Sequence, residues 1–172
     1  DYFSADLKRE EKPKLAVGAT YCYNQNTTRS GGQLGKFVFV LDTNGISTGD
    51  YDFNDISTFF VDMIYKHNGL SVMAVYANKN LSKDKSGFTS GSGYNAQVGF
   101  LFDNNYEISG RYTSVDLAKG LGIITNTTEY AIGFSKYIVD HKLKFQSDVA
   151  YINSESATSG NYRIRFQVEV GI

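Results

Sequence analysis

The sequence predicts an all-β protein: an antiparallel transmembrane β-barrel with about eight strands in this chain. Three observations support this prediction. Segments of about ten residues alternate between apolar and polar side chains, and strands of that length can cross a bilayer at a tilt. The connections between these segments are alternately long and short. Tyrosines recur on the apolar faces, near the same end of the segments.

The final segment, residues 161–172, shows the alternation most clearly, with the sequence NYRIRFQVEVGI. Its apolar face comprises Tyr162, Ile164, Phe166, Val168, Val170 and Ile172. Its other face comprises Arg163, Arg165, Gln167, Glu169 and Gly171. A strand with one fully apolar and one charged face borders two different environments. We expect this segment to be the last strand of a closed sheet.

The remaining strands are expected over about residues 14–24, 57–65, 70–76, 94–102, 106–112, 130–138 and 143–151. Tight turns are predicted at His67-Asn68-Gly69, Asp103-Asn104 and Asp140, of which Asn-Gly is the strongest hairpin signal. Residues 2–7 resemble the tail of a strand, and residues 8–13 a charged turn. The apolar island 36–41 lies in a long polar loop, where it is either an external hairpin or an inward-folded constriction loop.

Loop lengths predict how the barrel is oriented. Outer-membrane barrels combine tight periplasmic turns with long extracellular loops. If the C-terminus is periplasmic, every short turn falls on that side and every long loop falls outside. The predicted location is therefore the outer membrane of a Gram-negative bacterium, with residues 1–172 forming a single transmembrane domain.

Aromatic residues on the apolar face favour a lipid-facing exterior over a soluble core. Tyrosine belongs at a membrane–water boundary because its ring is apolar and its hydroxyl is polar. The predicted girdle comprises Tyr23, Tyr76, Tyr94, Tyr112, Tyr130, Tyr151 and Tyr162 at the loop end, with Tyr65, Phe102 and Tyr106 at the turn end. Lys136 is the one ionised residue on this face, close to a turn. The alternative is a soluble lipocalin-like barrel or β-sandwich.

Charged side chains on the polar face are the candidate functional residues. The candidate pore-lining residues are Lys66, Arg111, Lys142, Lys144, Arg163 and Arg165, with Asp62, Glu107, Glu129, Asp148 and Glu169. One interpretation is a pore lining whose fixed charges set ion preference. The other is a wall held together by cross-strand pairs, such as Glu107 with an opposing Arg or Lys. The net charge of −1 gives no global field for nucleic acid.

Enzymatic chemistry is not expected. His67 and His141 fall in predicted turns without a nearby nucleophile, and Cys22 lies on the polar face without a histidine partner. The acidic loop 50–55 fails the EF-hand template, because Asp55 stands where glycine is needed. We therefore predict no catalytic residues, no metal site and no cofactor.

Five blocks of the chain resemble the phosphate-selective porin O and P family in its Bacteroidetes form. They are KPKLAVGATY (12–21), DISTFFVDMIYKHNGLSVMAVYANKN (55–80), GFLFDNNYEISGRYTSVD (99–116), TEYAIGFSKYIVDHKLKFQSDVAYI (128–152) and YRIRFQVEVGI (162–172). The resemblance implies a barrel of about 16 strands of which this chain is the C-terminal half. The motifs are structural, so they do not identify phosphate as the solute.

The expected function is a porin, a passive diffusion channel for small hydrophilic or anionic solutes. The alternative is a structural or partner-binding outer-membrane barrel, either small and closed or part of a surface complex, without channel activity. Expected partners are outer-membrane lipids, lipopolysaccharide and the solutes, with a homotrimer or a larger outer-membrane complex as the assembly, and no nucleic acid. The sequence leaves the solute, the full strand count and the number of copies open.

Overall fold

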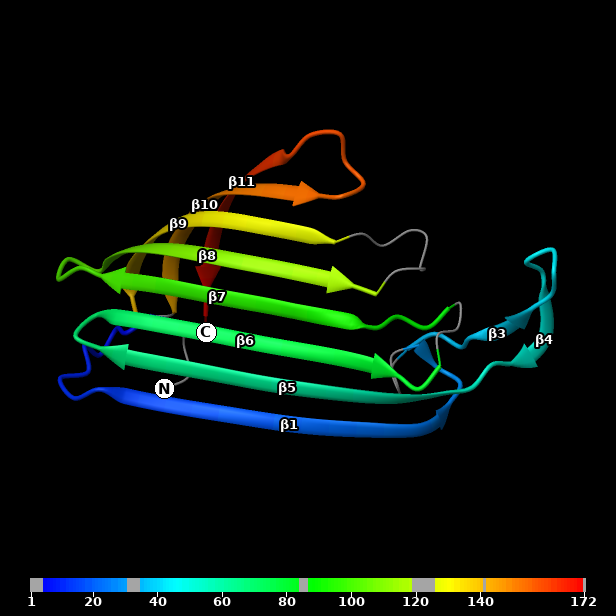
Figure 1. Cartoon of the computed structure of the whole chain (residues 1–172). Helices are drawn as coiled ribbons and strands as arrows, with labels where there is room; N and C mark the ends of the chain where they lie inside the picture. Colours follow the sequence, from blue (N-terminus) through cyan, green and yellow to red (C-terminus); the bar gives the residue numbers. More distant parts are fainter. Residues whose placement is uncertain (1–4, 31–34, 84–86, 119–125, 141, 172) are drawn as a thin grey trace.

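The computed structural model describes residues 5–30, 35–83, 87–118, 126–140 and 142–171. Within these residues the secondary structure is β only, and the main element is an antiparallel sheet of eight strands (Figure 1). The sheet order is β1-β5-β6-β7-β8-β9-β10-β11, so strands that follow one another in the chain also pair. The prediction of an all-β chain with about eight antiparallel strands is confirmed.

The strands have nearly the bounds that the alternation predicts. They are β1 (Lys14–Thr27), β5 (Asn54–His67), β6 (Leu70–Leu81), β7 (Gly91–Leu101), β8 (Tyr106–Leu117), β9 (Thr127–Val139), β10 (Leu143–Ser154) and β11 (Asn161–Val170). The short connections gather at one end of the sheet, which we call the turn end (Figure 1). The long connections gather at the other, the loop end.

The sheet curls but does not close. Strands β9, β10 and β11 bend round behind β7 and β8, whereas β1, β5 and β6 lie nearly flat (Figure 1). The outer edges of β1 and β11 have no partner strand in the described part of the chain. Closure by β11, which the sequence suggested, is therefore not achieved among the described residues.

The Asn68-Gly69 turn joins β5 to β6 as the sequence predicts. Asn68 and Gly69 have positive φ angles of 47° and 86°, the left-handed conformation that two-residue hairpin turns require. A Cβ atom at Gly69 would lie 2.6 Å from the carbonyl oxygen of Leu101, so glycine is needed here for space as well. The next turn is wider than expected, because Phe102 already lies outside β7.

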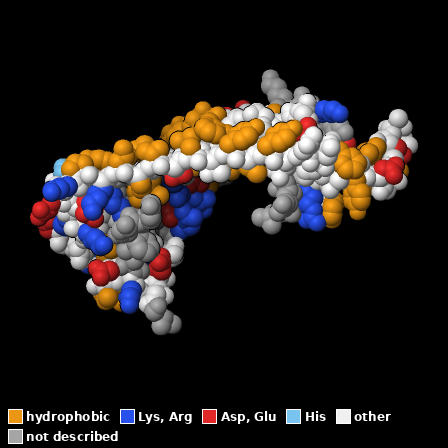
Figure 2. All heavy atoms as spheres, turned by 90° about the horizontal axis from the view of Figure 1, so that it is seen from below, with side chains coloured by type: hydrophobic (Ala, Val, Ile, Leu, Met, Phe, Trp, Pro, Cys, Tyr) orange, Lys and Arg blue, Asp and Glu red, His pale blue; other side chains and the backbone are white. Residues whose placement is uncertain are grey.

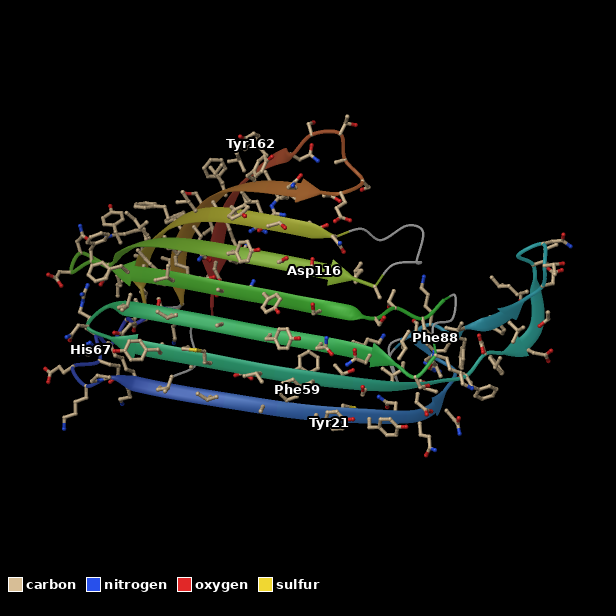
Figure 3. All side chains as sticks on the ribbon, viewed as in Figure 1. Tyr21, Phe59, His67, Phe88, Asp116 and Tyr162 are labelled. Atoms are coloured by element: carbon tan, nitrogen blue, oxygen red, sulfur yellow. The ribbon has the colours of Figure 1, made fainter. Side chains whose placement is uncertain are left out.

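Residues 39–51 form a separate hairpin of β3 (Phe39–Leu41) and β4 (Ser47–Tyr51). It extends beyond the loop end of the large sheet (Figure 1). Of the two alternatives for residues 36–41, the structure therefore contains the external hairpin and not the inward-folded loop. Val38 anchors it by packing in a buried cluster with Ile56 and Phe88. Phe88 lies at the base of the hairpin, whereas the paired residues Tyr21 and Phe59 lie out on the sheet (Figure 3).

Among the described residues, the two clusters of buried apolar side chains lie at the two ends of the sheet, and Ala131 and Ala150 are buried between them on the inner face. Ala5, Leu101 and Tyr137 form a cluster at the turn end, opposite the Val38 cluster at the loop end. Between them, large apolar side chains stand exposed along the outer face as a continuous band (Figure 2). A contiguous apolar surface of this extent indicates an interaction with lipid or another apolar partner.

Candidate functional site

The inner face of β8 to β11 holds most of the charged residues that the sequence singled out. The strand register aligns them in rows across the sheet. One row contains Arg111, Ala131, Ala150 and Arg163, and the next contains Ser109, Gly133, Asp148 and Arg165. We call this surface the charged wall. Its small residues occupy the middle strands, so long side chains from β8 and β11 can extend over them.

Glu129 joins two arginines from different strands. The Nη2 atom of Arg111 donates to Oε1 at 2.7 Å, and the Nη2 atom of Arg163 donates to Oε2 at 2.9 Å. Arg163 lies on β11, two strands from Glu129 on β9, and it crosses β10 at Ala150, whose side chain is fully buried. The carboxylate therefore links β8, β9 and β11 across the curled part of the sheet.

Two further ion pairs on the wall join direct neighbours on β10 and β11. The Nε atom of Arg165 donates to both carboxylate oxygens of Asp148, at 3.2 and 2.9 Å. The Nζ atom of Lys144 lies 3.0 Å from Oε2 of Glu169. The structure thus contains the cross-strand pairs that were one of the two interpretations of these charges.

Glu107 and Lys66 have different partners from those expected. Glu107 is only 4% exposed, and its Oε2 accepts a hydrogen bond from the hydroxyl of Tyr137 at 2.6 Å, while it forms no ion pair with an Arg or Lys among the described residues. Lys66 is 5% exposed and donates to the carbonyl oxygen of Ala5 at 3.1 Å. Both groups belong to a buried polar cluster at the turn end, and neither lines an open surface.

Residues 5–12 cover the turn end of the inner face. The carboxylate of Asp6 accepts hydrogen bonds from the backbone amides of Gly69 at 2.8 Å and Glu10 at 3.1 Å. Arg9 also pairs with Asp103 in the next turn at 3.0 Å. Residues 5–7 are therefore not the end of a strand as expected, because Asp6 binds a turn amide in place of ladder pairing. Residues 2–4 lie outside the described residues.

We expect Asp6→Ala to lower the free energy of unfolding by about 1–3 kcal/mol, because the buried amide of Gly69 and the half-buried amide of Glu10 lose their acceptor. Guanidinium titration of the folded protein measures this change. Asp42→Ala is the matched control, since Asp42 also accepts backbone amides, but in the exposed tip of the β3–β4 hairpin. Equal effects of the two substitutions would show that Asp6 does not hold the turn end together.

Six tyrosines of the predicted aromatic girdle form contacting pairs on the outer face. At the loop-end level, ring centroids lie 4.8 Å apart for Tyr76 and Tyr94, and 5.2 Å apart for Tyr112 and Tyr130. The ring centroids of Tyr151 on β10 and Tyr162 on β11 also lie 5.2 Å apart, so this pair continues the series (Figure 3). The common height that the sequence predicted follows from the register, which pairs these tyrosines directly.

Lys136 lies at the turn end of the outer face, as its sequence position indicated. Its Nζ atom donates to the carbonyl oxygen of Asn104 at 2.6 Å and lies 3.9 Å from the ring centroid of Tyr106. Tyr106 also stacks on Phe134, with ring centroids 5.4 Å apart. The ammonium group is thereby turned toward the polar turn and away from the middle of the apolar band.

The remaining candidate residues lie apart from the charged wall. Asp62 lies on the inner face of β5, beside Gly18 on β1, where an added Cβ would come within 2.7 Å of its Oδ1 atom. Lys142 lies in the turn between β9 and β10, outside the strands. Cys22 is a free, exposed thiol on the inner side of β1.

Sequence reasoning missed the polar, uncharged part of the wall. Gln97, Gln146 and Gln167 line a hollow of about 220 Å³ together with Arg111 and Arg165. The alternation already placed these glutamines on the polar face, so their position could have been inferred. That they meet depends on the curl of the sheet, which the pattern does not specify.

Among the described residues, no group of three or more His, Cys, Asp or Glu side chains could hold a metal ion. In the same residues there is no helix with the length and apolar character to cross a membrane. Comparisons with protein-family models, with curated proteins and with solved structures found no match. The charged wall, the buried turn-end cluster and the apolar outer face are therefore the features from which function is inferred.

Proposed function

We propose that the chain forms part of the wall of a transmembrane β-barrel in a bacterial outer membrane, and that this barrel is a passive diffusion channel. One observation supports this most strongly. The outer face exposes large apolar side chains on β1, β5 and β7 to β11, while the inner face of β8 to β11 holds paired charges. A soluble barrel or sandwich has the reverse polarity.

Lipid contact accounts for the outer face in detail. The tyrosine rows form a level at which the hydroxyls reach water, and the apolar band lies between them and Lys136. A charge inside that band would cost about 2–4 kcal/mol at the bilayer midplane. The placement of Lys136 at the turn end, with its ammonium group on a turn carbonyl, agrees with this requirement.

A channel also requires closure. The unpaired edges of β1 and β11 in this chain fit a larger barrel in which further strands complete the ring. The resemblance to the phosphate-selective porin O and P family implies such a barrel, with about 16 strands. In that arrangement the charged wall would face the water-filled interior and contribute to ion preference.

One observation favours the alternative, a barrel without channel activity. Residues 5–12 cover the turn end of the inner face through Asp6 and Arg9. A ring of only eight strands would also leave no more room inside than its own side chains fill. In that case the protein would act as a structural or partner-binding barrel in the outer membrane.

Planar-bilayer recording of the complete gene product separates the two functions. The proposal predicts stepwise ion conductance from heat-modifiable, correctly folded protein. Folded protein that inserts into the bilayer and gives no current would rule out the channel and leave the structural barrel. Protein that stays soluble and folded without detergent would rule out both.

A further inference from the structure

We propose that the hollow in the charged wall is a subsite for a neutral, polyhydroxylated solute such as a short oligosaccharide. This inference rests on the proposed function, because a channel would bring solutes past the wall, and it specifies the class of solute. The hollow lies on the inner face of β7 to β11 and has a volume of about 220 Å³. Its shape, the carboxylate pairing of its arginines and its unused hydrogen-bonding groups each support the assignment.

Small residues keep the hollow open. Ala131 and Gly133 of β9 line its floor, between the longer side chains of the neighbouring strands. A Cβ atom at Gly133 would lie 2.7 Å from the Oγ atom of Ser109, so any larger residue would crowd a second lining residue. The hollow therefore exists because small residues, Ala131 and Gly133, occupy β9 in the two adjacent rows of the charged wall.

The guanidinium groups in and beside the hollow already have carboxylate partners, and Arg111 shares its partner Glu129 with Arg163. Arg165 pairs with both oxygens of Asp148, and Arg111 pairs with Glu129. An inorganic anion would have to compete with these built-in carboxylates for the same donors. The pairing argues against a site for phosphate or another small anion.

Once the paired arginines are set aside, the lining groups available to bind a solute are the carboxamides of the glutamines. The side chains of Gln97 and Gln167 make no hydrogen bond within the described part of the chain, while Gln146 donates to the Oγ atom of Ser135 at 3.3 Å. A carboxamide offers both a donor and an acceptor, as a sugar hydroxyl does. A polyol uses both the donor and the acceptor of a carboxamide, whereas a metal ion binds only its oxygen.

Equilibrium binding tests the subsite independently of ion current. The probe is maltotriose, observed by saturation-transfer NMR on the complete, folded gene product in a detergent without a sugar headgroup. We expect a saturable signal that inorganic phosphate does not displace. We expect Gln97→Leu combined with Gln167→Leu to weaken binding about tenfold, which corresponds to losing two ordinary hydrogen bonds. Gln25→Leu is the matched control, since Gln25 lies on β1 and does not line the hollow.

Three results would overturn the subsite. They are no saturable maltotriose signal from the folded wild-type protein, displacement of maltotriose by phosphate, and an equal loss of binding in the Gln25→Leu control. The first two require no substitution, so the outcome does not depend on how well the variants fold. Maltotriose binding without bilayer current would rule out the channel function and support the subsite. Bilayer current without maltotriose binding would support the channel function and rule out the subsite.

Discussion

Replacing Ile132 with arginine is expected to lower the free energy of unfolding in lipid vesicles by about 2–4 kcal/mol. Ile132 is 70% exposed on the outer face of β9, between Tyr130 of the predicted girdle and Lys136 at the turn end. If the outer face contacts acyl chains, this substitution places a charge near the middle of the bilayer. If the outer face contacts water, an exposed Ile→Arg change should stay within about 0.5 kcal/mol.

The matched control for this experiment is Ile46→Arg. Ile46 is 64% exposed in the β3–β4 hairpin, beyond the apolar band, so the two positions differ in location and hardly in exposure. Guanidinium titration of both variants in phosphatidylcholine vesicles measures the difference. Two equally small changes would place the outer face of β9 in water and contradict the lipid-facing assignment.

Removing the charge of Glu129 is expected to affect both stability and ion preference. In Glu129→Gln, the guanidinium groups of Arg111 and Arg163 lose the carboxylate that they share, and we expect a loss of about 1–3 kcal/mol. The wall also gains one net positive charge, so the reversal potential in a KCl gradient should shift toward anion selectivity.

Glu155→Gln provides the comparison, because Glu155 lies in the loop between β10 and β11 and accepts a single hydrogen bond from Asn126. It removes the same charge outside the wall and should leave stability and reversal potential almost unchanged. If Glu129→Gln behaved like Glu155→Gln in both measurements, the link between β8, β9 and β11 would contribute neither stability nor selectivity.

The strands could be predicted from the sequence because one local rule governs them. Alternation places Val149 and Ile164 on the same face whatever the rest of the fold does, and Asn68-Gly69 fixes the β5–β6 register through its backbone conformation. Alternation also places the tyrosines on one face, whereas their pairing across the long loops is seen only in the register. Local pattern therefore accounts for the sheet and for which side chains share a face.

The parts that could not be predicted depend on curvature and on contacts between distant segments. Glu129 pairs with Arg163 across an intervening strand because Ala150 is small and the sheet curls, and neither condition is visible as a spacing. Asp6 binds the amide of Gly69, far along the chain, so residues 5–7 looked like a strand when read alone. Whether the ring closes depends on the partners of β1 and β11, which alternation does not identify.

Fluorescence quenching of single tryptophans tests the orientation of the sheet most directly, because the chain contains no tryptophan of its own. Ile132→Trp puts the indole on the outer face and Gln146→Trp puts it on the inner face. In vesicles, we predict that brominated acyl chains quench the Ile132→Trp variant and that aqueous iodide quenches the Gln146→Trp variant. Iodide quenching of Ile132→Trp without quenching by brominated lipid would contradict a lipid-facing outer surface.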